Sequence, residues 1–425
     1  MSNAVVRTTP QKRRGIFYGW WVLGAATASQ SLNSGLFFNG FGVFFLPILG
    51  EFGVGRAAIS GAISLSRVQT GILGPFEGWL VDRFGPRRIM LIGAAVMGVG
   101  FLLLAHVGNV LAFYIVFVFA LALGASFGFG PPPGAAVANW FRRRRGFAFG
   151  VYLSGTGVGA VAVPLVTLLV DKWGWREAAV VLAFVVWVLG VPLALMMRHR
   201  PEQYGMLPDG EVAPQPGEKA RPSLADEPEF TLGAAVRTRA FWFMGLSIAM
   251  RAFVFSSLGV HLIAAVQDRG FSAAQAGFIV ALVGVTSIAG RLLTGYLGDR
   301  LDNRLMASGG LVVFGISTLI FANAGAYWMI VLFAVLFGPS DGGFLSNYFA
   351  MRGQYFGRKA FATIGGALSV VQVVGSIIGP LCTGLIFDVK HTYTPAFYIF
   401  TACLMVGSVL ILMARPPSPP RQATP

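Results

Sequence analysis

The residue with the clearest chemical meaning is an arginine, Arg291, inside an apolar stretch that runs from Phe271 to Gly298. A charged side chain in such a stretch is costly, so it is usually paired or faces a cavity. Arg291 lies eight residues before Asp299, at the end of the stretch, which corresponds to a depth of roughly 12 Å at about 1.5 Å per residue of helix. At that depth a side chain does not easily reach back to the membrane surface. A guanidinium holds a carboxylate through two parallel hydrogen bonds. We therefore predict that Arg291 binds an anion; the alternative is a structural arginine.

Two further charges, Arg251 and Asp341, lie in other apolar stretches, Ala240–Gln267 and Tyr327–Met351. Counted from the same membrane face, both lie roughly 16 Å deep, so an ion pair is expected. Either the pair opens when Asp341 takes up a proton, or it is permanent because each charge alone would be costly to bury. If Arg251 instead faces a cavity, it becomes a second ligand for a carboxylate.

Four more polar residues are candidates. His261 and Asp268 are seven residues apart, on nearly the same helix face. Histidine can gain or lose a proton near neutral pH, so both residues are candidates for proton coupling, and His261 also for substrate binding. The alternatives are a packing role for His261 and an interfacial position for Asp268. Gln372 sits near the middle of the eleventh apolar stretch as a further substrate-binding candidate, and Arg67 could face a cavity.

The composition indicates a membrane protein. Of 425 residues, 55% are hydrophobic and only 12% charged, about half the charged share of soluble domains. Bilayer hydrocarbon offers no partners to the backbone, so the spans should be helices. The net charge of +15 is spread over short loops, which argues against nucleic-acid binding. There is no phosphate-binding loop, metal-site spacing or hydrolytic constellation; we expect no enzyme activity, cofactor or metal.

Twelve apolar stretches between Tyr18 and Met413 predict an all-α polytopic membrane protein with twelve transmembrane helices. We divide the chain into a six-helix half (1–197), a polar linker (198–239) and a second six-helix half (240–425). Of the 32 Lys and Arg residues, 24 fall on the side of the termini and linker and five on the other, which predicts that both termini are cytoplasmic.

The two halves are copies of each other. The segment Gly78-x-Leu80-x-Asp82-Arg83 recurs 217 residues later as Gly295-x-Leu297-x-Asp299-Arg300. Other matching positions place about eight extra residues in the second copy, around Ala350–Gly357. Since each half has an even number of spans, the repeat is parallel, as in one common class of transporter.

The sequence resembles the major facilitator superfamily over essentially its whole length. The loop Gly78–Arg88 matches the signature of that superfamily, G-x-L-x-D-R-x-G-x-R-R. Tyr18-Gly19-Trp20-Trp21, and the stretch Asn139–Gly150 with glycines 155, 157 and 159, look like the monocarboxylate porter and oxalate/formate branch. The resemblance implies the fold of two parallel six-helix halves. It also implies a gating network of loop charges, which we assign to Asp82, Arg83, Arg88, Glu77, Asp299 and Arg300.

In monocarboxylate carriers an arginine on the eighth helix binds the substrate, and Arg291 matches that position. Those carriers place an aspartate one turn earlier, where this chain has Ser287, so the site of proton binding stays open. The similar oxalate carriers add a lysine within the eleventh helix; here that helix has no cation after Lys359. One fixed charge suits one carboxylate, so a dicarboxylate is disfavoured.

We therefore expect a secondary active transporter of a small monocarboxylate such as lactate or pyruvate, a proton symporter working by alternating access and driven by the proton gradient. Its partners would be the carboxylate, protons and the lipid bilayer. We expect a monomer in the plasma membrane, the inner membrane if the source is bacterial. The alternatives are a proton-driven exporter of a larger organic acid or drug, an organic-anion exchanger, or a non-transporting sensor on the same fold.

Overall fold

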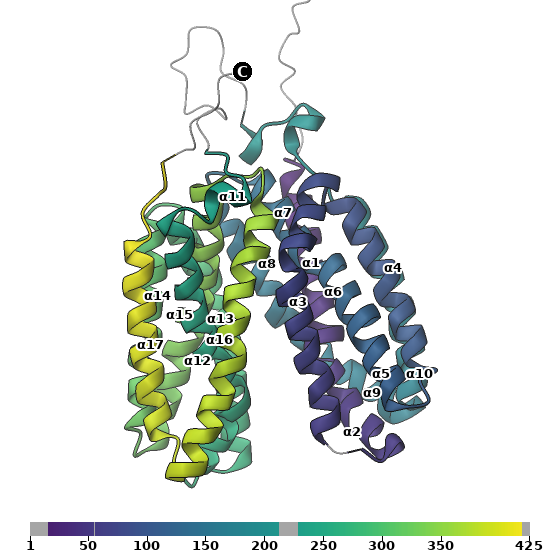
Figure 1. The fold of residues 1–425 in the computed structure, drawn as a ribbon, viewed down its shortest axis with the longest axis vertical. Coiled ribbons are helices and arrows are strands. Elements are labelled where there is room, and N and C mark those ends of the chain that lie inside the picture. Colours follow the sequence, from purple (N-terminus) through teal and green to yellow (C-terminus); the bar gives the residue numbers. More distant parts are fainter. Residues whose placement is uncertain (1–15, 55, 212–227, 419–425) are drawn as a thin grey trace, which may run out of the picture.

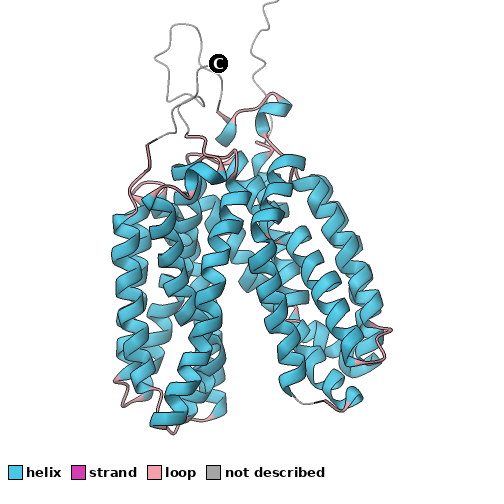
Figure 2. Cartoon of the chain, in the orientation of Figure 1, coloured by secondary structure: helices cyan, strands magenta, loops and turns pink. Residues whose placement is uncertain are grey.

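The computed structural model describes residues 16–54, 56–211 and 228–418, without the side chains of 56–60. Within these ranges all regular secondary structure is helical (Figure 2). Eleven helical runs of this part of the chain are long and apolar enough to cross a membrane. The predicted second span is helix α3 (Arg56–Phe84), which has the length to cross but is less apolar, since it carries Arg67, Glu77 and Asp82.

The first half of the chain forms one bundle. Its first span is α1, a π-helical turn (η1) and α2, and its fourth is made of α5, η2, α6 and α7. Residues 198–211 of the linker form two short 3-10 turns, η3 and η4. In chain order the elements besides α3 are α1 (Gly19–Asn33), η1 (Ser34–Phe38), α2 (Phe41–Phe52), α4 (Pro86–Leu104), α5 (Val110–Val116), η2 (Phe117–Ala122), α6 (Leu123–Phe129), α7 (Pro131–Trp140), α8 (Arg145–Ala160), α9 (Val163–Trp173), α10 (Trp175–Met196), η3 (Pro201–Tyr204) and η4 (Pro208–Gly210).

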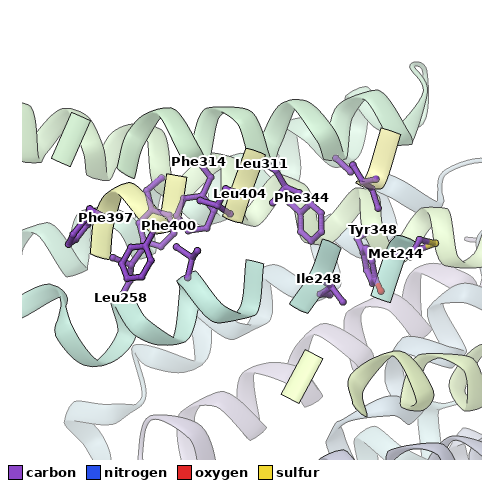
Figure 3. Close-up of a cluster of buried hydrophobic side chains, with 14 of the residues drawn as sticks. Met244, Ile248, Leu258, Leu311, Phe314, Phe344, Tyr348, Phe397, Phe400 and Leu404 are labelled. Carbon is purple, nitrogen blue, oxygen red and sulfur yellow. The ribbon is translucent and has the colours of Figure 1, made fainter. Parts of the chain in front are cut away.

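The second half forms a second bundle around its own apolar core. Phe314, Phe400 and Leu404 lie in the part of this core drawn in Figure 3, between α12, α14 and α17. The short linker helix α11 (Leu232–Ala235) precedes its elements, which are α12 (Arg239–Gln267), α13 (Ala273–Gly298), α14 (Asn303–Ala322), α15 (Tyr327–Phe356), α16 (Phe361–Lys390) and α17 (Thr394–Met413).

The two bundles approach each other at the end of the molecule that carries α11 and diverge toward the opposite end (Figure 1). We call the first end the linker end, because linker residues 198–211 lie there. At this end α3 packs on α16, and α8 packs on α13. The contacts are backbone to backbone: a Cβ added to Gly78 would collide with the Ala362 carbonyl, and one added to Gly295 would meet the Gly146 carbonyl. The two glycines are equivalent positions of the repeated loop.

The extra residues of the second copy form helix. Helix α7 ends at Trp140, whereas α15 continues past the matching position, Tyr348, to Phe356. The predicted stretch Ala350–Gly357 thus adds about two helical turns. Helix α15 therefore reaches further toward the linker end than the predicted span, which ended at Met351.

Candidate functional site

The structure brings Arg251 and Asp341 together. In the contact between α12 and α15, Nε and Nη2 of Arg251 each lie 2.7 Å from Oδ1 of Asp341. The side chains are only 4% and 3% exposed. The Arg251 guanidinium also lies 4.8 Å from the centre of the Phe255 ring. The pair has the geometry predicted from the equal depth of its two residues, while its role in transport stays a prediction.

Arg291 reaches from α13 toward the other bundle. Its Nη1 donates a hydrogen bond to the carbonyl oxygen of Leu153 in α8, at 2.5 Å. The side chain is buried, and its Nε has no hydrogen-bond partner. Both Asp341 and Arg251 lie within electrostatic range of it. Two buried guanidiniums therefore share one carboxylate, which leaves about one positive charge for a bound anion to balance.

The other predicted ligands lie apart from this cluster. One ring nitrogen of His261 is 3.2 Å from the Tyr393 hydroxyl, and the other is 3.1 Å from the Pro380 carbonyl oxygen. Asp268 is exposed at the end of α12, and Arg67 is exposed on α3. Gln372 is half-buried in α16. In the part of the chain that the structure describes, none of these four side chains hydrogen-bonds to Arg251, Asp341 or Arg291.

The aspartates of the repeated loop each cap a helix of the opposite bundle. Asp82 accepts hydrogen bonds from the amides of Ala362 (3.1 Å) and Thr363 (2.8 Å), where α16 begins. Asp299 accepts from the amides of Gly146 (2.6 Å) and Phe147 (3.0 Å), where α8 begins. A carboxylate at a helix N-terminus pairs with unsatisfied amides and the positive end of the helix dipole. The repeat thus provides two equivalent contacts between the bundles at the linker end.

The Asp299 carboxyl lies just beyond the end of α13, against the first turn of α8, where it is half-buried. Loss of solvent raises its pKa to about 6, against the lowering effect of the two amide hydrogen bonds. Asp209 of the linker, a like charge nearby, contributes to the rise. The linker carboxylate accepts hydrogen bonds from the amides of Arg142 (2.9 Å) and Arg143 (2.7 Å). No feature of the sequence predicts this linker contact.

The charge network predicted around these aspartates is only partly assembled. In the described residues, neither Asp82 nor Asp299 forms an ion pair with the predicted cations. Arg83 stacks on Trp79, at 5.2 Å from the ring centre; Arg300 stacks on Tyr296, at 4.4 Å; and Arg88 is exposed.

Glu77 lies outside the loop network. It is buried and accepts a hydrogen bond from the hydroxyl of Ser126 in α6. Five residues at about 100° each put Glu77 and Asp82 on different faces of α3, which explains the difference. Glu77 faces α6 of its own bundle, while Asp82 faces α16.

Glu77 lines a cavity of about 270 Å³ between the bundles. The walls come from α1, α3, α6, α7 and α8 on one side and from α15 and α16 on the other. Arg352, which lies just beyond the predicted span Tyr327–Met351, also lines it. Arg352 lies in the two extra turns of α15, so the predicted insertion is the signal that could have found it.

Comparisons with known proteins agree with this architecture. The family model described as "Major Facilitator Superfamily" matches residues 27–272 and 244–425. Monocarboxylate transporter 13 of Rattus norvegicus is 25% identical, over 93% of this chain and 88% of its own length. Monocarboxylate transporter 4 of the same species is 25% identical over 97% and 87%, and human monocarboxylate transporter 11 is 25% identical over 93% and 82%.

Solved structures share the fold. The human organic anion transporter MFSD10 superposes with a TM-score of 0.72 at 15% identity, covering 92% of this chain and 99% of its own. The E. coli fucose:proton symporter gives 0.69 at 16% identity, covering 94% and 100%. The family model matches most of the chain, relatives align with more than nine-tenths of it, and the fold has twelve helices in two bundles. This chain therefore belongs to the major facilitator superfamily of membrane transporters.

Proposed function

We propose that this protein is a secondary transporter of a small monocarboxylate, of the lactate and pyruvate type, that moves its substrate together with a proton. The curated relatives that match almost the whole chain are named monocarboxylate transporters, which supports this substrate class. The sequence has no phosphate-binding loop, so ATP is not the expected energy source, and the proposed source is the proton gradient.

The observation that carries the proposal is the buried cluster of Arg251, Asp341 and Arg291. Its two cations and one anion leave one unbalanced positive charge. Burying an uncompensated charge is unfavourable, so a bound monoanion stabilises the cluster. Arg291 carries the free donor, Nε, and its bond to the Leu153 carbonyl can be exchanged for a bond to substrate. Arg291 is therefore the proposed carboxylate ligand.

Asp341 is the proposed proton carrier. When a proton neutralises its carboxylate, Arg251 is released from the ion pair and is available to the substrate anion. The proton and the monocarboxylate are then bound at the same time and cross the membrane together, as a symporter requires. His261 and Asp268 remain candidates for passing the proton between the cluster and the opposite end of the molecule.

Transport proceeds by alternating access between the halves 1–197 and 240–425, joined by the linker 198–239. We place the linker end and both termini in the cytoplasm, because the positive charges of the loops gather there. The caps made by Asp82 and Asp299 then hold the cytoplasmic side closed in this conformation. Rocking of the halves breaks both caps and opens that side.

The test is uptake of labelled lactate and pyruvate into proteoliposomes, with and without an inward proton gradient. We expect uptake that the gradient stimulates and that Arg291→Ala abolishes while the protein stays folded in the membrane. Near-normal uptake by Arg291→Ala would exclude it as the anion ligand. If the intact protein takes up no monocarboxylate, the exporter of larger acids or the anion exchanger replaces this proposal.

A further inference from the structure

The cavity between the bundles contains a buried cation, Arg352, that the proposed transport cycle does not use. Arg352 is buried, with only 8% of the residue exposed. Among the described residues no carboxylate hydrogen-bonds or ion-pairs with it, and its Nε has no partner. Asp82, an acid within electrostatic range of it, is hydrogen-bonded to the first turn of α16. A buried charge without a paired acid is costly, so this arrangement calls for a ligand.

The surroundings hold the guanidinium in place without using its donors. Its central carbon lies 3.8 Å from the centre of the Phe361 ring and 4.7 Å from that of Phe349. Gly365 lies against it, where an added Cβ would collide with Nη1. Stacking on ring faces uses the π-surface of the guanidinium and none of its N–H groups. The donors are therefore available to an acceptor that enters the cavity.

The rest of the cavity is suited to a small organic acid. The apolar part of the lining includes Phe37, Phe38 and Phe349, which offer packing surface to a carbon skeleton. The Tyr152 hydroxyl donates to Oε1 of Gln30 at 3.2 Å, and both residues line the cavity. The acid in the lining, Glu77, is hydrogen-bonded by Ser126 on the wall of the first bundle.

The cavity also adjoins the buried cluster. Leu153, whose carbonyl oxygen accepts the hydrogen bond from Arg291, follows Tyr152 in α8 and lines the same cavity. The charge of Arg352 acts on the hydroxyl of Tyr152. Arg291 and Arg352 thus approach the same turn of α8 from two different helices of the second bundle, α13 and α15.

We propose that Arg352 is a second carboxylate-binding residue, which holds the acid group of a substrate with a short apolar skeleton in this cavity. The inference rests on the proposed function and extends it: the carrier offers the anion two positions along its path, one at Arg291 and one at Arg352. The sequence predicted one fixed cation for the substrate; this proposal has two, Arg291 and Arg352.

Binding to the purified full-length protein tests this, with tryptophan fluorescence as the signal and two matched pairs of probes, lactate with lactamide and benzoate with benzamide. Each pair has the same skeleton and differs in charge. In a protein that already carries Arg291→Gln, so that only the second position remains, we expect Arg352→Gln to lower the affinity for the acids about 10- to 100-fold, the range for a lost hydrogen bond to a charged group. The affinity for the amides should change less than twofold. Arg352→Lys, which keeps the charge but not the bidentate geometry, should recover part of the loss. The control Arg415→Gln removes an exposed cation from the chain terminus.

The ratio of acid to amide affinity separates a ligand from a structural residue. If Arg352→Gln weakens acids and amides equally, Arg352 only supports the closed linker end, and the inference is overturned. It is also overturned if the variant binds the acids as tightly as its Arg291→Gln parent, and the proposed function then stands. A wild-type protein that binds none of these acids overturns both. Should Arg352→Gln fail to fold, Gly365→Ala makes the same test, because its Cβ displaces the flexible tip of Arg352.

Discussion

The buried pair of Arg251 and Asp341 gives a prediction with a magnitude. Asp341→Asn leaves Arg251 buried without its counter-charge and within range of the like charge of Arg291. Breaking a buried ion pair by removing one partner costs about 3–5 kcal/mol. The double variant Arg251→Gln/Asp341→Asn removes both charges, and we expect it to recover most of that loss, because replacement of a whole buried pair is often neutral.

The measurement is a double-mutant cycle of unfolding free energies in detergent micelles, combined with proton-coupled uptake. The matched control is Asp388→Asn, an exposed carboxylate on the spanning helix α16, expected within about 0.5 kcal/mol of the wild type. A loss below about 1 kcal/mol for Asp341→Asn would refute the reasoning that the pair needs its carboxylate. Unaltered proton coupling in a folded Asp341→Asn protein would reject Asp341 as the proton carrier, whatever its stability.

Two further predictions concern the closed linker end. Gly78→Ala should reduce the population of the closed state, because the new Cβ meets the Ala362 carbonyl; Gly309→Ala, with open space around it, is the control. Spin labels across the linker end measure this, and equal distance distributions in the two variants would contradict it. Burial raises the pKa of Asp299 to about 6, so the closed state binds the proton more tightly than a state with a solvated carboxyl. Acidification from pH 7.5 to 5.5 should therefore favour closure, an advantage lost as pH rises through about 6. The same labels should show a weaker pH response in Asp299→Asn, and an unchanged response would exclude Asp299 as its source.

Much of the architecture follows from the sequence alone, because it depends on local properties. The apolar stretches give the spans, and the repeated loop gives the two equivalent halves. The depth of a residue in a span follows from its position along the helix, since each residue adds a fixed rise. For this reason the pairing of Arg251 with Asp341 could be predicted, and Arg291 could be recognised as a deeply buried cation.

Only the tertiary structure decided which faces of these helices meet. Position along a helix does not show that Glu77 turns to Ser126 while Asp82 turns to the other bundle. Nor does it show that α15 continues for two more turns where a loop was expected, or that Arg352 therefore lines the cavity. These features depend on how two bundles with many equally apolar faces pack against each other. That choice is made by close backbone contacts such as that of Gly78 with Ala362, between residues nearly three hundred positions apart.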